Sequence, residues 1–350
     1  MLYQAPPVSE REAEVIDEID AIRKELIGGV RISREWTGLP WRAIGPSAGA
    51  SAAGTDRPSI AGYRTALTWL LQLVEDPTFT CDEGIIRGLH HLIVGHDPAK
   101  HPGCWRRSRI FVRKEEGGDV VYQGPDPRLI PALMAELVAT INARSDVPLV
   151  VRAAVVHFNL SAIHPFLDGN GRLARALHSL VLMQGGIVAP PFASIDEYLS
   201  VNGGAYDLAL RSTHGGRWQP ERDSRPFVHF CLTAHYHQAT MLRRRTQEYD
   251  HLWEELEREV QRRGLPERMV SALAHAAVGG LMTNAEYRSV ASISPRVAAS
   301  DLKRLAIEHL LVVSDEAARL PAYVAADAIK SIRARTLNPY EPEGNPFKDS

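Results

Sequence analysis

The chain has 350 residues, which allows two or three domains, and 45% of them are hydrophobic, so a core of good size can form. A formal net charge of −2 excludes a generally basic nucleic-acid coat and leaves only a local basic patch open. Three scattered cysteines exclude a disulfide framework, and no apolar run is long enough for a membrane span or a signal peptide, so a cytoplasmic protein is expected.

The first part of the chain predicts three helices by its apolar periodicity, over residues 8–28, 59–75 and 81–95. Ser9 with Glu12 forms a capping box at the start of the first helix, and Thr80 with Glu83 predicts another at the start of the third. We expect residues 1–58 to form a separate N-terminal helical segment.

Two β-prone runs follow, on either side of a Gly-Gly turn, and they include Ile110, Phe111, Val112, Val121 and Tyr122. This pattern predicts a hairpin. An ordinary surface hairpin and a flap over an active site both fit it. Helices are then expected over residues 127–143 and 148–162, and the second is apolar almost all round, so it should lie in the core.

Residues 164–175 bring one histidine, one carboxylate, one amide, two glycines and two arginines into one short segment. Its sequence is His-Pro-Phe-Leu-Asp-Gly-Asn-Gly-Arg-Leu-Ala-Arg. Gly169 and Gly171 allow a tight backbone turn that points N–H groups into one concave spot. A helix resumes at about Arg172, so this nest lies at a helix N-terminus, where N–H groups and the helix dipole favour phosphate. Arg172 and Arg175 share a helix face and offer planar forks for phosphate oxygens.

Asp168 and His164 complete this set. Asp168 supplies a hard oxygen ligand that suits Mg²⁺ bridging to phosphates. His164 lies beside the nest as a candidate general base. The residues alone therefore indicate a polyphosphate cradle with a base next to it.

The 164–175 segment resembles the Fic family signature, His-Pro-Phe-x-(Asp/Glu)-Gly-Asn-Gly-Arg-x-x-Arg, at every specified position. The resemblance implies an all-α Fic fold with a small β-hairpin flap and a catalytic core over residues 59–250. It also implies a protein adenylyltransferase, which moves AMP from Mg-ATP to a Ser, Thr or Tyr hydroxyl of a target protein or of itself. ATP is then the donor substrate, and Mg²⁺ is the metal.

The resemblance assigns a role to each residue of the segment. His164 takes the hydroxyl proton, and Asp168 holds Mg²⁺ on the α- and β-phosphates. Phosphate oxygens are bound by backbone N–H groups near Gly169, Asn170 and Gly171, by the Asn170 side chain, by Arg172 at the β-phosphate and by Arg175 at the γ-phosphate.

The hairpin over residues 109–122 becomes, on the same resemblance, the flap that holds an extended target segment by strand addition. Its five residues named above would contact the target. Asn202 and Tyr206, at positions i and i+4, are candidates for the adenine pocket, and ordinary helix packing explains them equally well.

Many relatives carry an inhibitory helix whose glutamate, in the pattern (Ser/Thr)-x-x-x-Glu-(Gly/Asn), covers the second arginine of the signature. No Glu-Gly or Glu-Asn pair of this chain has Ser or Thr four residues before the glutamate, and Ala53 stands where the glutamate is expected. We therefore expect nothing recognisable to cover Arg175.

After the core, His229, His235 and His237 lack a regular helix-face spacing and a neighbouring carboxylate or cysteine, so no metal site is predicted there. Residues 264–335 predict a winged helix-turn-helix domain, whose third helix begins at Ser294-Pro295 and is followed by two strands. Residues 336–350 predict a loose tail.

DNA binding by this domain would rely on Arg296, Lys303 and Arg304. Acidic residues, Asp301 among them, dilute this charge, so contact with another protein or homodimerisation is favoured over DNA.

Two alternatives stay open for the whole chain. The winged helix binds DNA while the Fic core senses a nucleotide, or the Fic enzyme uses another donor, such as UTP, or transfers phosphate. Gly171 disfavours phosphate transfer, because relatives with that activity carry Lys at this place.

Overall fold

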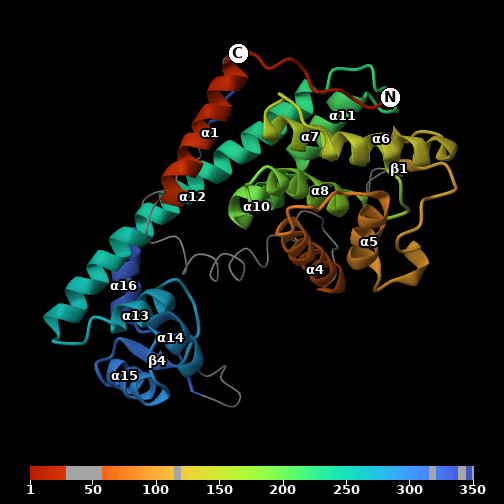
Figure 1. The fold of residues 1–350 in the computed structure, drawn as a ribbon. Coiled ribbons are helices and arrows are strands. Elements are labelled where there is room, and N and C mark those ends of the chain that lie inside the picture. The colour runs from red at the N-terminus through yellow and green to blue at the C-terminus, as the bar shows by residue number, and fades with distance from the viewer. Residues whose placement is uncertain (29–56, 114–119, 315–320, 338–343, 349–350) are drawn as a thin grey trace. The chain divides into compact units, whose positions relative to one another are not determined.

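The computed structural model describes residues 1–28, 57–113, 120–314, 321–337 and 344–348 (Figure 1). The chain divides into two compact units: unit 1 is Met1–Thr240 with Gly344–Ser350, and unit 2 is Met241–Glu343. Each unit has its own hydrophobic core. Ala53, where the covering glutamate was sought, lies outside the described residues.

Unit 1 is mainly helical. Its α-helices are α1 (Glu10–Gly28), α4 (Arg57–Val74), α5 (Glu83–Val94), α6 (Ile130–Asn142), α7 (Leu149–Ile163), α8 (Asn170–Gln184), α9 (Pro190–Ala193), α10 (Asp196–Val201), α11 (Gly203–His214) and the first part of α12 (Arg225–Arg262). Two 3₁₀ helices, η2 (Pro98–Lys100) and η3 (Pro127–Leu129), and the strands β1 (Phe111–Arg113) and β2 (Val120–Gln123) complete it. Across the described residues, every helix is too short or too polar to cross a bilayer.

The core of unit 1 is built around α7 and α8, which pack along each other (Figure 1). α7 is buried on almost every side, as its uniformly apolar sequence predicted. α4 and α5 pack against α8 and against each other. The two ends of the 164–175 segment are therefore fixed by two core helices.

Two helix starts differ from the prediction. α5 is capped by Asp82, whose side chain accepts from the Ile85 N–H, and not by a Thr80–Glu83 box. Asp82 immediately precedes the first helical residue, where a cap acts, whereas Thr80 lies too far upstream. α8 begins at Asn170, two residues before the predicted start. The capping box of α1 is confirmed, with Ser9 N–H donating to Glu12 at 2.6 Å and Glu12 N–H donating to Ser9 Oγ at 3.3 Å.

Both ends of the chain pack onto unit 1. Tyr3 exchanges two hydrogen bonds with Asn159 of α7, and α1 contributes to the same core, so residues 1–28 are part of this unit. Phe347 stacks on His229 with ring centroids 4.2 Å apart. Residues 344–348 are thus anchored, which corrects the predicted loose tail for this stretch.

Unit 2 comprises the last part of α12, then α13 (Met269–Ala277), β3 (Met282–Thr283), α14 (Asn284–Ala291), α15 (Pro295–Ile307), β4 (Leu311–Val313), β5 (Ala322–Ala325) and α16 (Asp327–Thr336). The strands form an antiparallel sheet in the order β3-β5-β4. Ser294 caps α15 and Pro295 opens it, as predicted. Three helices followed by a two-stranded hairpin match the element order expected of a winged helix, while β3 and α16 are additional.

Candidate functional site

The 164–175 segment turns sharply between α7 and α8. His164 ends α7 in the left-handed region, with φ of 50°, and Gly169 precedes α8 with φ of 77°. A Cβ on Gly169 would come within 2.7 Å of Val94 Cγ1, so both its conformation and its surroundings require glycine. Backbone strain at His164 is typical of a functional position.

Asn170 holds the turn closed from inside. Its Oδ1 accepts from the Phe166 N–H at 3.0 Å, and its Nδ2 donates to the Phe166 carbonyl at 2.9 Å. The side chain is buried. The prediction that the Asn170 amide binds phosphate does not fit this placement, because both of its ends are already bonded to the loop.

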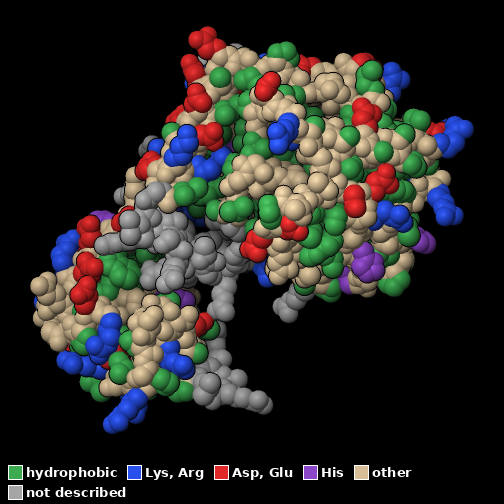
Figure 2. Space-filling model, viewed as in Figure 1, with side chains coloured by type: hydrophobic (Ala, Val, Ile, Leu, Met, Phe, Trp, Pro, Cys, Tyr) green, Lys and Arg blue, Asp and Glu red, His purple; other side chains and the backbone are tan. Residues whose placement is uncertain are grey.

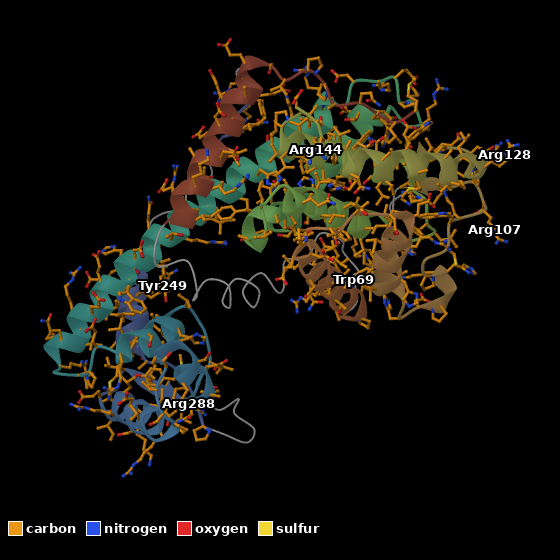
Figure 3. All side chains as sticks on the ribbon, viewed as in Figure 1. Trp69, Arg107, Arg128, Arg144, Tyr249 and Arg288 are labelled. Carbon is orange, nitrogen blue, oxygen red and sulfur yellow. The ribbon has the colours of Figure 1, made fainter. Side chains whose placement is uncertain are left out.

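Two residues outside the segment also fix it. His90 of α5 stacks on Phe166, accepts from the Gly103 N–H at Nδ1, and lies 2.9 Å by its Nε2 from the Asp168 carbonyl. Arg106 is buried and donates to the carbonyls of His164, Ile163, Ser108 and Pro125. Its neighbour Arg107 extends outward instead (Figure 3). Sequence position alone does not separate these two arginines.

His164 is held as a neutral base. Its Nδ1 lies 3.3 Å from the Ser161 carbonyl oxygen, so a protonated Nδ1 donates there and Nε2 carries the lone pair. Burial lowers the pKa of His164 to about 4, assisted by Arg106 and opposed by the Ser161 hydrogen bond and by Asp168. The imidazole is therefore unprotonated at neutral pH and ready to accept a proton.

The first turn of α8 offers backbone donors. The first i→i−4 bond of the helix runs from the Leu173 N–H to the Gly169 carbonyl, at 3.0 Å, so the N–H groups of Asn170, Gly171 and Arg172 precede it. A Cβ on Gly171 would meet no atom within 4 Å. This geometry leaves room for an anion directly against the backbone.

Asp168 is paired with Lys100, a contact that the sequence pattern did not reveal. Lys100 Nζ lies 2.7 Å from Asp168 Oδ2, and Arg172 Nη2 lies 3.7 Å from Oδ1. Burial raises the pKa of Asp168, but hydrogen bonds from Lys100 and from the Gly169 N–H outweigh it and hold that pKa below its ordinary value. The side chain is 44% exposed and ionised, so it fits a hard divalent cation in place of the ammonium.

Arg175 is covered, contrary to expectation. Its Nε lies 2.7 Å from Oδ1 of Asp196, the first residue of α10, and its guanidinium lies over the Tyr63 ring at 5.3 Å. The Tyr63 hydroxyl donates to Asp196 Oδ2 at 2.9 Å. Burial lowers the pKa of Arg175, but the charge of Asp196 outweighs this and raises it above its usual value. A carboxylate therefore pairs with Arg175, although it comes from a part of the chain outside the sought motif.

The predicted hairpin is present, with Val112 opposite Tyr122 and Phe111 opposite Gln123. Tyr122 is buried and donates to the Ala162 carbonyl at 2.6 Å, so it anchors the hairpin on α7 and does not face a target. Phe111 is 44% exposed. Ile110, Val112 and Val121 are half-buried.

Asn202 and Tyr206 do not share one continuous helix, because Asn202 separates α10 from α11. The Asn202 amide donates to the Tyr198 carbonyl at 2.9 Å. Tyr206 lies with its hydroxyl 3.1 Å from His157 Nε2 and packs against Phe227. These contacts account for both residues structurally and leave the adenine pocket a prediction.

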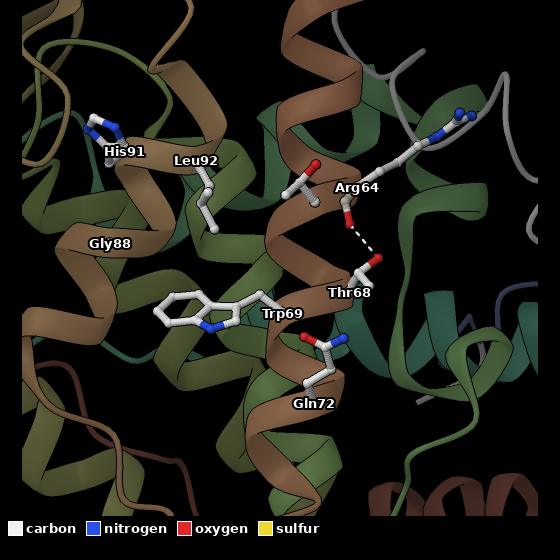
Figure 4. A pocket seen from close by; sticks show the side chains of 8 residues that line it. Arg64, Thr68, Trp69, Gln72, Gly88, His91 and Leu92 are labelled. Atoms are coloured by element: carbon white, nitrogen blue, oxygen red, sulfur yellow. Dashed lines mark hydrogen bonds between the residues drawn. The ribbon is translucent and has the colours of Figure 1, made fainter.

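A separate pocket of about 640 Å³ lies between α4 and α5 (Figure 4). Trp69 of α4 points toward α5, whose Gly88 and Leu92 line the pocket, and Gln72 lines it from α4. None of the residues predicted for nucleotide or metal lines this pocket.

Residues 80–182 match the model of the Fic/DOC family. The "Protein adenylyltransferase Fic" of Drosophila ananassae is 33% identical over 144 residues, which are 41% of this chain and 25% of that protein. The "Protein adenylyltransferase fic-1" of Caenorhabditis briggsae is 28% identical over 119 residues, 33% of this chain and 22% of the relative. The chain thus spans about a quarter of the length of the curated relatives it matches.

Solved structures share the fold. A Fic family protein from Desulfovibrio desulfuricans superposes with a TM-score of 0.53 at 17% identity, covering 93% of this chain and 99% of that one. A Fic domain containing signaling protein from Bacteroides thetaiotaomicron gives a TM-score of 0.51 at 20% identity, covering 66% and 97%. The signature at 164–175, the matching family model and the shared fold agree in one respect: residues 80–182 of this chain are similar to the Fic/DOC family.

Proposed function

We propose that the chain is a protein adenylyltransferase that moves AMP from ATP to a hydroxyl of a target protein. One observation carries the proposal: His164, neutral and with Nε2 available, stands next to open backbone donors at the start of α8. The matched relatives bear the name protein adenylyltransferase.

In the proposed reaction the target hydroxyl oxygen attacks the α-phosphorus, and His164 Nε2 takes its proton. The bond from the α-phosphorus to the bridging oxygen breaks, and pyrophosphate leaves with the electron pair. The N–H groups of Asn170, Gly171 and Arg172 bind phosphate oxygens, and Arg172 and Arg175 neutralise charge. The chain then acts mainly by positioning and by electrostatic stabilisation.

Asp168 is the residue that would hold Mg²⁺. The cation would neutralise phosphate charge when bound. Lys100 keeps the carboxylate ionised and oriented until then.

The hairpin is the proposed target-binding element. The Gln123–Arg217 bridge lies on the outer side of β2, and among the described residues no strand pairs with the outer edge of β1. An extended target segment can therefore add at β1, beside Phe111.

The test is transfer of label from α-labelled ATP to lysate proteins or to the chain itself. We expect His164→Ala to lose on the order of 10²-fold or more in rate and still to bind ATP, because only the base is removed. His91→Ala, on the surface of α5, is the matched control. Full transfer by His164→Ala would remove the assignment, and a panel of α-labelled nucleotides separates ATP from other donors such as UTP.

DNA binding by unit 2 is a second candidate, favoured by one observation. Asp301, counted above against it, is buried and paired with Arg268 at 2.7 Å, so it does not dilute the exposed charge of Arg296, Lys303 and Arg304. On the face shown in Figure 2, however, basic and acidic side chains are interspersed. Salt-dependent retardation of duplex DNA by the full chain supports this role, and no retardation at low salt removes it.

A further inference from the structure

A second cluster of titratable side chains lies in the core of unit 1, outside the 164–175 segment. His157 comes from α7, His178 from α8, and Cys231 and His235 from α12. Each is at most 3% exposed. Ligand atoms of His157, His178 and Cys231 lie within 4.8 Å of one another, and Nε2 of His178 lies 2.9 Å from Nε2 of His235.

The pattern on α12 has metal-ligand spacing. Cys231 and His235 are at positions i and i+4, so they lie on one helix face. Pairs of ligands at this spacing commonly bind one ion from a single helix. His235 was compared above with His229 and His237, whereas Cys231 lies one turn earlier on the same helix and His178 lies beside His235 in space.

His157 has a buried nitrogen that lacks a hydrogen-bond partner in the part of the chain that the structure describes. His157 bonds to the Tyr206 hydroxyl through Nε2, while its buried Nδ1 has no hydrogen-bond partner among the described residues. A buried polar atom without a partner costs stability. An ion at the centre of the cluster would satisfy this nitrogen, and the Tyr206 hydroxyl would fix the ring from its far side, as outer partners of metal-bound histidines do.

We propose that His157, His178 and Cys231 bind a structural Zn²⁺ ion, and that the His235 side chain, which lies next to His178, moves in to supply the fourth ligand. Imidazole nitrogen and thiolate sulfur are the ligands that Zn²⁺ takes in closed structural sites. Ligand atoms around tetrahedral Zn²⁺ are about 3.5 Å apart, so the side chains close in by roughly 1 Å. Binding converts the Cys231 thiol to a thiolate and releases its proton to solvent.

Cobalt substitution tests the site without reference to transfer activity. Full-length protein is purified from cells grown in zinc-poor medium with Co²⁺, and its absorption spectrum is recorded. We expect a near-ultraviolet sulfur-to-cobalt band, and about one zinc per chain by mass spectrometry when the cells grow with zinc. Cys231→Ser should abolish the band.

Matched variants separate this site from others in the chain. Cys81→Ser, at a buried cysteine, and Cys104→Ser, at an exposed one, should keep the band. Asp168→Ala should keep it as well, because that carboxylate belongs to the nucleotide site. If Cys231→Ser does not fold, a band retained in both cysteine controls still assigns the ligand to Cys231.

Wild-type protein that carries no zinc and shows no sulfur-to-cobalt band overturns the proposal. The cluster is then a set of neutral packed histidines. A band lost in Cys81→Ser or Cys104→Ser overturns it too.

Discussion

The two ends of the 164–175 segment use their polar groups in opposite ways. At the His164–Gly171 end, the side chains of His90, Arg106 and Asn170 form hydrogen bonds that fix the backbone. The first N–H groups of α8 make no bond within the helix. One turn later, Arg175 is itself engaged by a carboxylate. In the proposed reaction, the first end is thus shaped in advance for an anion, whereas Arg175 would be shared between Asp196 and an incoming phosphate.

The largest expected effect is on stability, and it comes from removing the carboxylate that pairs with Arg175. Asp196→Ala leaves a buried arginine without its charge partner and should lower the free energy of unfolding by about 3–5 kcal/mol. Chemical denaturation measures it. Asp17→Ala, on the exposed side of α1, is the surface control and should change stability by about 0.5 kcal/mol or less. Equal stability of the two variants would mean that Asp196 does not hold Arg175.

Gly169 and Gly171, at the His164–Gly171 end of the segment, should respond differently to an added side chain. Gly169→Ala should destabilise the fold by about 1–3 kcal/mol, because its positive φ and the nearby Val94 exclude a side chain. Gly171→Ala has room for its methyl group, so it should keep the stability and weaken ATP binding by filling the phosphate space. Calorimetry with ATP measures the second effect. Unchanged ATP affinity in a folded Gly171→Ala protein would mean that the phosphate does not bind against Gly171.

The protonation state of His164 gives a third test. Its pKa of about 4 means that the base is deprotonated from pH 8 down to about pH 5, so kcat/KM should show no inflection near pH 6.5. Activity should fall only as the pH drops through about 4, where protonation removes the lone pair. Circular dichroism at each pH shows whether the chain remains folded. An inflection of kcat/KM near pH 6.5 would mean that the His164 imidazole is exposed to solvent and that burial does not lower its pKa.

The smallest effect concerns Lys100. Because its ammonium occupies the position that a cation would take beside Asp168, Lys100→Met should lower the Mg²⁺ concentration for half-maximal ATP binding, by roughly two- to fivefold for a partly exposed pair. Lys330→Met, in unit 2, is the control. A higher Mg²⁺ requirement in Lys100→Met would show that the lysine assists the cation.

The sequence predicts the features that depend on residues close to one another along the chain, and it misses those that depend on distant residues. The helices on both sides of residues 164–175, the cap of α1 and the turn between α7 and α8 depend on neighbours within a few residues, and their patterns are visible along the chain. The cover on Arg175 depends on Tyr63 and Asp196, which are distant in sequence and meet it only in the folded chain.

The same limit explains the remaining differences. Tyr122 reads as a strand residue, yet its hydroxyl is bonded to α7, which no local pattern shows. The Asn170 amide belongs to the signature, but only the fold reveals that it closes the turn. Arg106 and Arg107 are adjacent and chemically identical, and they differ only in that the fold buries Arg106 and exposes Arg107.

Phe347 has a practical consequence for dividing the chain. Residues 344–348 return to unit 1 after the whole of unit 2, where Phe347 stacks on His229 and the Pro346 carbonyl accepts from Arg11. A single stop codon after residue 240 would therefore remove unit 2 and also strip these contacts from the part that is kept. Isolating unit 1 calls for an internal deletion that retains the last residues. A truncated protein that lacks the proposed activity would not show that unit 2 is needed for it.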